Sequence, residues 1–375
     1  MSTARATDLH DLAAGGSPTA AVPGPPLAPE PLVDRQHRTV EYLRVSVTDR
    51  CNYRCTYCIP ESGLEHLERE DVLSVDELVR LVACFARLGV RRLRLTGGEP
   101  TVRGDLPALA ARLRAVPGIE DLSLSTNGHR LGELARALRA AGVDRLNVSV
   151  DSLSPERFTR ITRGGSLARV LAGIEAARSA GFTSIKINAV AVRGFNDDEI
   201  GPLCAFAWER GLLPRFIEQM PMADGALYVP GTFMSAREIR EAVAAATGAE
   251  RIAPLPPSRA VGAGPARYFR VEGGAQPGAA DRCFGIISAV TEHFCDTCNR
   301  VRLAANGALH TCLGHDDATD LRAVMRARGE VAVIETIRAA VERKRDGHAF
   351  GLASGLVPVV RLAGGPKKAM VQIGG

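Results

Sequence analysis

The sequence predicts an α/β fold organised around a parallel sheet, in the form of a partial barrel or an open sheet. From residue 40 onward, short runs rich in β-branched residues alternate with longer amphipathic stretches, which is typical of repeated strand–helix units. Cysteines, glycines and polar residues directly follow several of these runs, and parallel α/β folds gather their active sites at the carboxyl ends of the strands. Six strands are expected before residue 220, at 42–48, 91–96, 122–126, 145–150, 184–192 and 213–219.

Helix start signals lie between the expected strands. Ser74 with Glu77 and Ser235 with Glu238 fit reciprocal capping boxes, in which each side chain accepts a hydrogen bond from the other residue's backbone N–H. Ser154, which precedes a proline, fits a capping residue followed by a first-turn proline. We therefore expect helices to begin directly after these three serines.

The chain divides into four predicted parts. Residues 1–38 are rich in Ala, Gly, Pro and Ser and offer no periodic apolar face, which predicts a disordered arm. Residues 39–250 carry the strand–helix pattern, residues 251–345 form a smaller C-terminal region with its own cysteines, and residues 346–375 form a tail that ends in Gly-Gly. The Pro- and Gly-rich stretch 254–267 has no contacts that the sequence can assign.

Composition excludes several classes of protein. At 375 residues and 46% hydrophobic, the chain can bury a full core. Its 47 basic and 42 acidic residues are scattered, which argues against a nucleic-acid interface. No stretch approaches the roughly 20 apolar residues of a membrane span, and the N-terminus lacks the apolar region of a signal peptide. The nine cysteines are an odd number, which argues against a disulfide framework. We expect a soluble cytoplasmic protein.

Three cysteines, Cys51, Cys55 and Cys58, directly follow the first expected strand in a CxxxCxxC pattern. This spacing brings three thiolates within reach of one metal cluster and leaves a fourth position without a local protein ligand. Structural zinc sites normally use four protein ligands, whereas an open position lets another molecule bind the metal. A loop without metal and a zinc site completed by a distant histidine are the alternatives.

A second set of cysteines lies in the C-terminal region, at Cys295, Cys298 and Cys312. It again contains only three thiols, so a second iron–sulfur cluster with one open iron is the sharper hypothesis. The alternative is a zinc ribbon that uses His293, His310 or His315.

A hairpin is expected inside this second set, because Asn306-Gly307 is a strong signal for a two-residue turn. Such a turn pairs Ala305 with Ala308 and places Cys312 opposite Val301. The hairpin would thereby return Cys312 to the CxxC pair. The remaining cysteines occur singly and are interpreted as structural: Cys84, Cys204 and Cys283.

The CxxxCxxC loop, with Tyr57 before its last cysteine, resembles the radical S-adenosylmethionine (SAM) enzymes, as does Gly97-Gly98-Glu99-Pro100 after the second strand. In that superfamily the three cysteines hold a [4Fe–4S] cluster whose fourth iron binds SAM, and an electron from the cluster cleaves SAM to a 5′-deoxyadenosyl radical. The resemblance implies a partial (β/α)6 TIM-like barrel of the radical SAM type with a smaller second-cluster region. It assigns SAM binding to Tyr57, Gly97, Gly98, Glu99, Thr126, Ser149 and Met220, with Glu99 receiving the methionine ammonium.

Within that superfamily, residues 40–375 are similar to the GTP 3′,8-cyclase family of molybdenum cofactor biosynthesis. The stretches that carry this likeness are LRVSVTDRCNYRCTYC, RLRLTGGEPTVR, CDTCNRVRL and the terminal QIGG. The resemblance implies a lyase with two [4Fe–4S] clusters and SAM, in which hydrogen is removed from C3′ of GTP and C3′ then attacks C8. The product would be 3′,8-cyclo-7,8-dihydro-GTP.

The same resemblance assigns substrate and catalytic residues. The open iron of the second cluster would bind guanine, and cationic side chains would hold the triphosphate, since planar guanidinium pairs well with phosphate oxygens. Arg300 and Arg302 also occupy alternate positions of one strand and so share a face. The terminal Gly374 and Gly375 are expected to reach into the active site. The substrate-binding set is Arg44, Arg92, Arg94, Lys186, Arg215, Arg300 and Arg302.

Partners follow from the resemblance alone. It implies a reducing electron donor and delivery of the product to cyclic pyranopterin monophosphate synthase, and a homodimer is one candidate assembly. Two other functions stay open: a different radical SAM enzyme with an auxiliary cluster that acts on a peptide or another nucleotide, and a non-enzymatic zinc- or cluster-bearing interaction protein. The second would leave the Gly-Gly-Glu-Pro motif and the Gly-Gly tail unexplained.

Overall fold

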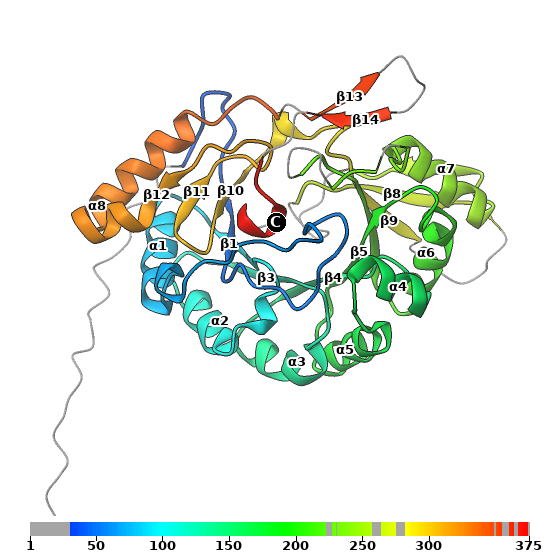
Figure 1. The fold of residues 1–375 in the computed structure, drawn as a ribbon, viewed down its shortest axis with the longest axis horizontal. Helices are drawn as coiled ribbons and strands as arrows, with labels where there is room; N and C mark the ends of the chain where they lie inside the picture. The colour runs from blue at the N-terminus through cyan, green and yellow to red at the C-terminus, as the bar shows by residue number, and fades with distance from the viewer. Residues whose placement is uncertain are drawn as a thin grey trace, which may run out of the picture.

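The computed structural model describes residues 31–222, 227–229, 231–256, 264–274, 282–348, 350–354, 360–363 and 367–373. In these residues a curved 12-stranded sheet forms an open barrel, with helices on its outer face (Figure 1). The strand order is β12-β11-β10-β1-β2-β3-β4-β5-β6-β9-β8-β7, and β13 (Gly351–Ser354) pairs with β14 (Val360–Ala363) in a separate ribbon.

The strands of the large sheet are β1 (Tyr42–Ser46), β2 (Arg92–Thr96), β3 (Asp121–Thr126), β4 (Arg145–Ser149), β5 (Ile185–Ala191), β6 (Leu213–Glu218), β7 (Arg251–Pro254), β8 (Arg267–Glu272), β9 (Cys283–Ile287), β10 (Arg300–Leu303), β11 (Ala308–His310) and β12 (Thr319–Asp320). The α-helices are α1 (Val75–Arg87), α2 (Leu106–Arg114), α3 (Leu131–Ala140), α4 (Pro155–Thr162), α5 (Leu167–Ser179), α6 (Ile200–Glu209), α7 (Ala236–Thr247) and α8 (Leu321–Glu342).

The six expected strands are confirmed as β1 to β6, and neighbours in this series pair in parallel. The partial barrel that the resemblance implied is therefore the observed fold. Both predicted capping boxes form, at Ser74 and Ser235, so α1 and α7 begin where expected. Ser154 accepts a hydrogen bond from the backbone N–H of Arg157 and starts α4, whose first residue is proline.

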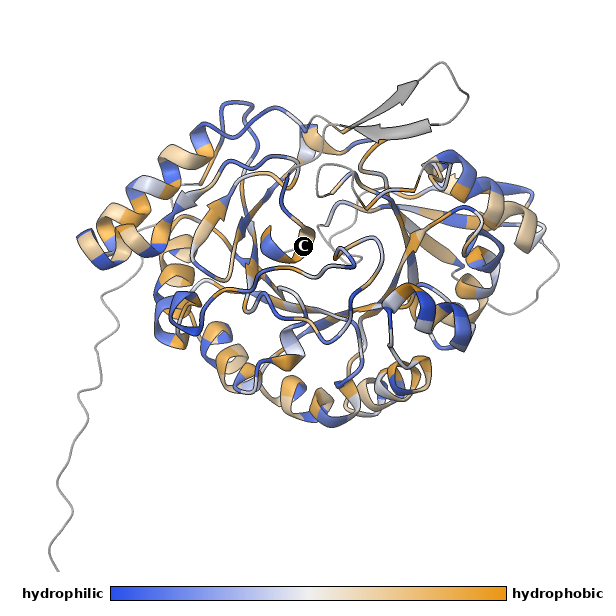
Figure 2. Cartoon of the chain, in the orientation of Figure 1, coloured by the Kyte–Doolittle hydropathy of each residue, from blue (hydrophilic) through white to orange (hydrophobic). Residues whose placement is uncertain are grey.

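Alternation along each strand separates the core from the interior of the barrel. In β2, Leu93 and Leu95 are fully buried in the hydrophobic core, while Arg92 and Arg94 take the alternate positions. Hydrophobic stretches accordingly mark both the strands and the outer helices in Figure 2. The apolar layer between sheet and helices holds the strands in place, and the opposite face is left to polar side chains.

The C-terminal region extends both edges of the same sheet. Strand β10 pairs in parallel with β1, and β9 pairs in parallel with β6. Outside these edges, α8 is tied to α1 and to the segment before it by ion pairs of Arg326 with Glu77 and of Arg322 with Asp71. The proposed boundary at residue 250 stays a prediction.

The hairpin at Asn306-Gly307 is present, but its predicted register is wrong by one residue. Strand β10 pairs with β11 so that Leu303 lies opposite Leu309, which makes Ala304 the partner of Ala308. Gly307 has φ +87° and donates its N–H to Ala304, the geometry of a three-residue loop with a left-handed glycine. Extended by two residues, this register puts Cys312 level with Arg300 instead of Val301.

The predicted arm ends earlier than expected. Residues 31–38 are described and packed: Leu32 is 2% exposed, Val33 forms a β-bridge with Thr39, and the buried Arg38 pairs with Asp34 at 2.6 Å. The disorder predicted for the arm does not extend to this segment, because Leu32 is buried and the ion pair between Arg38 and Asp34 holds it in place. Residues 1–30, like Gly374 and Gly375, lie outside the described residues.

Candidate active site

The first cysteine loop leaves the carboxyl end of β1 at the mouth of the barrel. Cys55 accepts backbone hydrogen bonds from Cys58 and Ile59 through its carbonyl, and the N–H of Tyr53 lies 3.4 Å from Cys51 Sγ. Burial raises the pKa of Cys51 to about 11, and burial with the neighbouring Cys51 raises that of Cys58 to about 12. Ionising these thiols therefore requires a compensating positive charge, which a metal cluster supplies on binding. Three free thiols in this setting fit an iron–sulfur cluster with three protein ligands.

Gly97 and Gly98 let the end of β2 pass directly against the segment that leads into this loop. A Cβ at Gly97 would lie 2.2 Å from the carbonyl oxygen of Thr48, and one at Gly98 would lie 2.3 Å from that of Arg50. The two backbones are joined by hydrogen bonds from Gly98 N to Thr48 O and from Glu99 N to Arg50 O, each 2.9 Å. The glycines thus position the cysteine loop on the sheet.

Glu99 connects two strand ends. Its buried carboxylate accepts hydrogen bonds from Thr101 N and Thr101 Oγ1 beyond β2, and from Thr126 Oγ1 and Asn127 N at the end of β3. Burial raises its pKa, and these four donors oppose that effect. A carboxylate held in this way is rigid and lies beside the first cysteines, where it raises the pKa of Cys51.

The predicted SAM residues Tyr57, Ser149 and Met220 line one large cavity. The Tyr57 hydroxyl donates to Asp151 Oδ2 at 2.7 Å, and Asp151 Oδ1 accepts from Val190 N at 2.8 Å. Burial raises the pKa of Asp151 to about 6. The sequence singled out Tyr57 but missed Asp151, which follows β4 and bonds to a residue of β5.

The second cysteine set, Cys295, Cys298 and Cys312, lines the same cavity as Tyr57 of the first cysteine loop. The volume of this cavity is about 1370 Å³ including open solvent. Burial opposes ionisation of Cys298, but Arg300 and Lys344 outweigh it and lower the pKa of Cys298 to about 6. The three free thiols at Cys295, Cys298 and Cys312 again suit a cluster with one open iron.

The histidines considered for zinc take other contacts. His315 Nε2 lies 2.9 Å from the carbonyl oxygen of Gly347, and the ring of His293 packs edge-on against His348 at 5.9 Å. His310 is 1% exposed on β11, opposite Arg302, and burial lowers its pKa to about 4. The lone cysteines Cys84 and Cys204 are buried in the core, as predicted.

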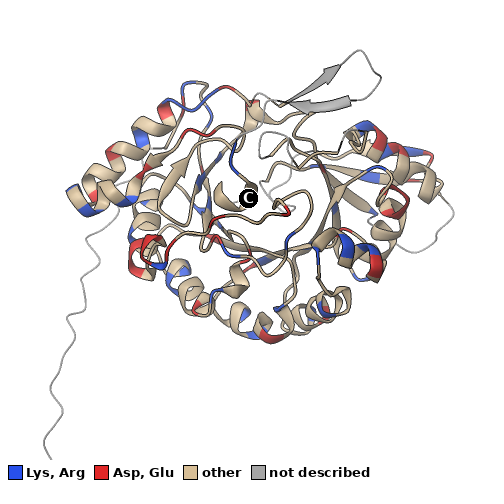
Figure 3. Cartoon of the chain, in the orientation of Figure 1, with Lys and Arg blue, Asp and Glu red and all other residues tan. Residues whose placement is uncertain are grey.

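One row of side chains crosses the interior of the barrel. Strand register aligns Arg302, Arg44, Arg94, Ser123 and Arg145 on β10, β1, β2, β3 and β4. Burial and the facing Arg302 and Arg94 lower the pKa of Arg44 well below its ordinary value. Figure 3 shows Lys and Arg positions on the inner strands of the barrel as well as on its outer helices. Arginines collected in this way favour a multiply charged anion.

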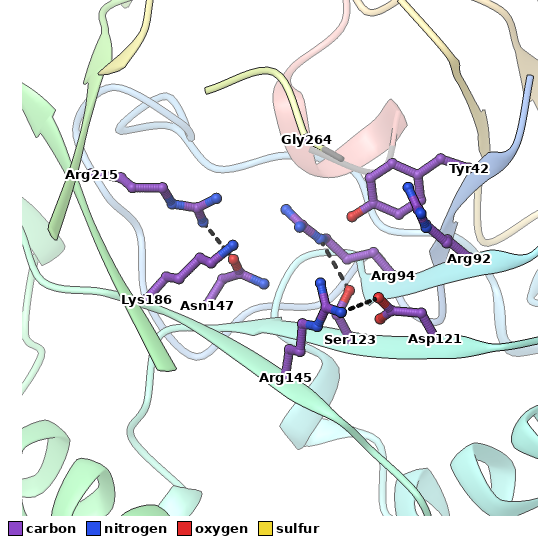
Figure 4. A pocket seen from close by; sticks show the side chains of 10 residues that line it. All are labelled: Tyr42, Arg92, Arg94, Asp121, Ser123, Arg145, Asn147, Lys186, Arg215 and Gly264. Carbon is purple, nitrogen blue, oxygen red and sulfur yellow. Dashed lines mark hydrogen bonds and ion pairs between the residues drawn. The ribbon is translucent and has the colours of Figure 1, made fainter. Parts of the chain in front are cut away.

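A smaller cavity of about 410 Å³ including open solvent (Figure 4) shares Tyr42 and Arg94 with the large one. Arg215, on β6, donates to Asn188 Oδ1 at 2.9 Å and to Asn147 Oδ1, which fixes its guanidinium. Three further basic side chains line this cavity: Arg92 and Lys186, which were predicted to bind substrate, and Arg145, which was not. The cavity therefore gathers five basic side chains from the strands β2, β4, β5 and β6.

The sequence reasoning missed Arg145, Asn147 and Tyr268. Arg145 forms an ion pair with Asp121 at 3.1 Å, and Tyr268 Oη lies 3.4 Å from Lys186 Nζ. Arg145 and Asn147 could have been found from the sequence, because they alternate with the buried Leu146 along β4. Tyr268 could not, because it reaches Lys186 only through the pairing of β8 at the far edge of the sheet.

The C-terminal tail leads into the mouth of the barrel (Figure 1). Val371 packs with Ile59 and the half-buried Cys58, and Ile373 is fully buried with Met222 and Phe350. The backbone N–H of Lys367 donates to Asp316 Oδ2 at 3.1 Å and fastens the start of this segment. Gly374 and Gly375 directly follow Ile373.

Comparison with known proteins agrees with this geometry. Residues 45–207 match the radical SAM superfamily, and residues 214–350 match Molybdenum Cofactor Synthesis C. The chain is 43% identical over 321 residues to the GTP 3′,8-cyclase of Hydrogenovibrio crunogenus, which covers 85% of this chain and 94% of that protein. The chain belongs to the GTP 3′,8-cyclase family. It is likewise 44% identical to GTP 3′,8-cyclase 1 of Pseudomonas aeruginosa, over 88% of this chain and 97% of that protein.

A solved structure supports the fold of this GTP 3′,8-cyclase family member. Streptococcus suis SuiB bound to S-adenosylmethionine superposes with a TM-score of 0.55 at 14% identity, over 83% of this chain and 70% of that chain. The family's cofactors are two [4Fe–4S] clusters and SAM, and both cysteine sets have the donor chemistry for a cluster. The zinc-ribbon alternative is therefore set aside.

No helix in the described part of the chain is both long and apolar enough to cross a membrane.

Proposed function

We propose that this chain is a GTP 3′,8-cyclase that converts GTP to 3′,8-cyclo-7,8-dihydro-GTP in molybdenum cofactor biosynthesis. The observation that carries the proposal is the interior row of arginines, of which Arg302, Arg44 and Arg94 line a cavity that also holds the second cysteine set and Tyr57 of the first cysteine loop. A nucleoside triphosphate has the negative charge that this row requires and a base that can reach the second set.

The first site is proposed to hold SAM. Cys51, Cys55 and Cys58 would hold the cluster, which with SAM supplies a 5′-deoxyadenosyl radical. Glu99 offers a rigid carboxylate for the methionine ammonium, since four donors fix its oxygens. The rest of SAM would be received by Tyr57, Thr126, Ser149 and Met220.

The triphosphate of GTP is proposed to lie in the smaller cavity. Arg92, Arg94, Lys186 and Arg215 face this space from β2, β5 and β6, and their cationic groups suit phosphate oxygens. Arg44, Arg300 and Arg302 line the large cavity near the second cysteines and would hold the nucleotide between the two centres. The sugar would then lie between the clusters.

The tail is proposed to complete the site. Ile373 is fully buried in an apolar cluster with Met222 and Phe350, and Gly374 and Gly375 follow it in the sequence. Two glycines without side chains can approach a bound nucleotide closely.

The proposed partners are a reducing electron donor and cyclic pyranopterin monophosphate synthase, which would receive the product. We also propose a homodimer and a cytoplasmic location. None of the nine cysteines, all of which lie in described residues, forms a disulfide, and six lie in candidate cluster sites, which suits a reducing compartment.

The test is an anaerobic assay on the reconstituted full chain. Cleavage of SAM to 5′-deoxyadenosine is followed with GTP, with ATP and without nucleotide, and the nucleotide product is identified by mass spectrometry. The proposal expects GTP to accelerate cleavage and to yield the cyclised nucleotide, while ATP, with the same triphosphate, yields none. Cleavage that is indifferent to GTP would instead support a radical SAM enzyme with another substrate.

Nucleotide binding is expected to take up a proton at Lys186. Burial and the facing Arg215 and Arg94 lower the pKa of Lys186 to about 6, so its amine is neutral at pH 7.5 in the free protein. A bound triphosphate raises that pKa, because it stabilises the ammonium, and affinity should fall as pH rises above about 6. Calorimetry at pH 7.5 in two buffers of different ionisation enthalpy measures the uptake.

Two variants test whether the proton is taken up by Lys186 or by another group. Lys186→Met should lose the uptake together with affinity. Lys186→Arg, which stays charged, should bind without it. The same proton uptake in Lys186→Met as in the parent chain would show that another group is responsible.

A further inference from the structure

A short segment after α8, residues 344–348, lies against the second cysteine set. Lys344 is 3% exposed, and its Nζ donates to Cys298 Sγ at 3.4 Å and to the carbonyl oxygen of Thr311 at 3.0 Å. Thr311 precedes Cys312, so this one ammonium contacts the cysteine segments on both arms of the hairpin. A buried lysine held in this way is a fixed positive charge at a sulfur atom.

The same segment also contacts Cys295. The backbone N–H of His348 hydrogen-bonds to the Cys295 sulfur, an effect that opposes the rise in the thiol's pKa caused by burial. A Cβ at Gly347 would lie 3.6 Å from Cys295 Sγ, so the backbone passes beside this sulfur. Two of the three sulfurs of the set therefore receive donors from residues 344–348.

Arg38 fixes the segment. Its guanidinium donates to the carbonyl oxygens of Arg345 at 2.7 Å, Asp346 at 2.8 Å and Cys295 at 2.9 Å, and it pairs with the buried Asp34. These bonds tie the segment to the first cysteine of the set. The donors at the sulfurs are consequently held by buried bonds and do not depend on a mobile surface chain.

The first cysteine set has a different charge environment. The charged neighbours that affect its thiols are the carboxylates of Glu99 and Asp151, which raise their pKa values. At the second set, Arg300 and Lys344 act on Cys298 in the opposite direction. Hydrogen bonds to sulfur and net local charge are the main protein contributions to the reduction potential of a cluster.

We propose that Lys344 is a positioning residue that raises the reduction potential of the cluster held by Cys295, Cys298 and Cys312. Adding one electron to a [4Fe–4S] cluster adds one negative charge, and a buried ammonium beside Cys298 stabilises the reduced form. The inference rests on the proposed function, because it requires a cluster at this set.

The experiment is a redox titration of the reconstituted full chain with dithionite as the one-electron donor, followed by electron paramagnetic resonance. Lys344→Gln keeps a donor to Thr311 without the charge, and Arg343→Gln removes an exposed charge one position away. A Cys55→Ala background identifies the signal of the second cluster. We expect Lys344→Gln to lower the equilibrium constant for its reduction about tenfold, or about 59 mV for one electron. In Lys344→Gln, the equilibrium constant for reduction of the first cluster should stay within about twofold of that in the parent chain. In Lys344→Arg and Arg343→Gln, the equilibrium constant for reduction of the second cluster should also stay within about twofold of the parent value.

Three results bear on the inference. An unchanged potential in Lys344→Gln with full iron content would overturn it. Loss of the second cluster from that variant would also overturn it, because Lys344 would then be needed to retain the cluster. A parent chain that binds only one cluster would contradict the proposed function itself.

Discussion

Cys55→Ala is expected to abolish cleavage of SAM, by about a thousandfold or more, because the radical chemistry is supplied by the cluster at this site. Iron should fall from about eight to about four atoms per chain, since each [4Fe–4S] cluster contains four. Cys55 is the central cysteine of the loop, and its carbonyl accepts two of the backbone bonds that shape it. The measurements are iron content and 5′-deoxyadenosine formation in the presence of excess dithionite.

The matched control is Cys204→Ala. Cys204 is buried on α6 as part of the core, so its loss should cost about 1 kcal/mol of stability while iron content and turnover stay near those of the parent chain. Full iron and retained SAM cleavage in Cys55→Ala would show that the first cysteine set does not hold the catalytic cluster.

Arg94→Gln is expected to raise the KM for GTP by roughly 10- to 150-fold, the equivalent of about 1.5–3 kcal/mol for charge-assisted bonds to phosphate. Arg94 lines both cavities, and its Nε faces the hydroxyl of Ser123 at 3.4 Å. Its positive charge is therefore directed to the cavity. The measurement is steady-state GTP turnover, together with SAM cleavage in the absence of GTP, which should change little.

Arg145→Gln provides the comparison in the same row. The Arg145 guanidinium pairs with Asp121 at 3.1 Å, so its charge is already balanced and the KM should rise less than in Arg94→Gln. An equal or larger effect of Arg145→Gln would mean that the phosphates displace this ion pair. Equal and small effects in both variants would place the triphosphate elsewhere.

Local patterns predicted most of the barrel. The capping boxes at Ser74 and Ser235 depend on residues three apart, and the alternation of Leu and Arg in β2 depends on neighbours, so each can be recognised from a few adjacent positions. The CxxxCxxC spacing and the glycines at 97–98 are equally local. These features lie directly after β1 and β2, where the first centre was expected.

Predictions that depended on pairing between distant segments were less accurate. The hairpin at 306–307 was expected as a two-residue turn, but Gly307 adopts a left-handed conformation in a three-residue loop and shifts the register by one. Residues 31–38 were assigned to the arm because nothing in their composition shows that Arg38 binds carbonyl groups more than 250 positions away.

The sequence by itself determined which residue types are available, the order of strands and helices, and the two sets of three thiols, because these follow from short-range spacing. Only the tertiary structure decided that β10 lies beside β1, which aligns Arg302 with Arg44 and Arg94. It also decided that Lys344 contacts Cys298, 46 positions away. The physical reason is that strand register, and the position of the segment that follows α8, are set by packing of the whole core. No short segment of the chain contains enough of that core to determine them.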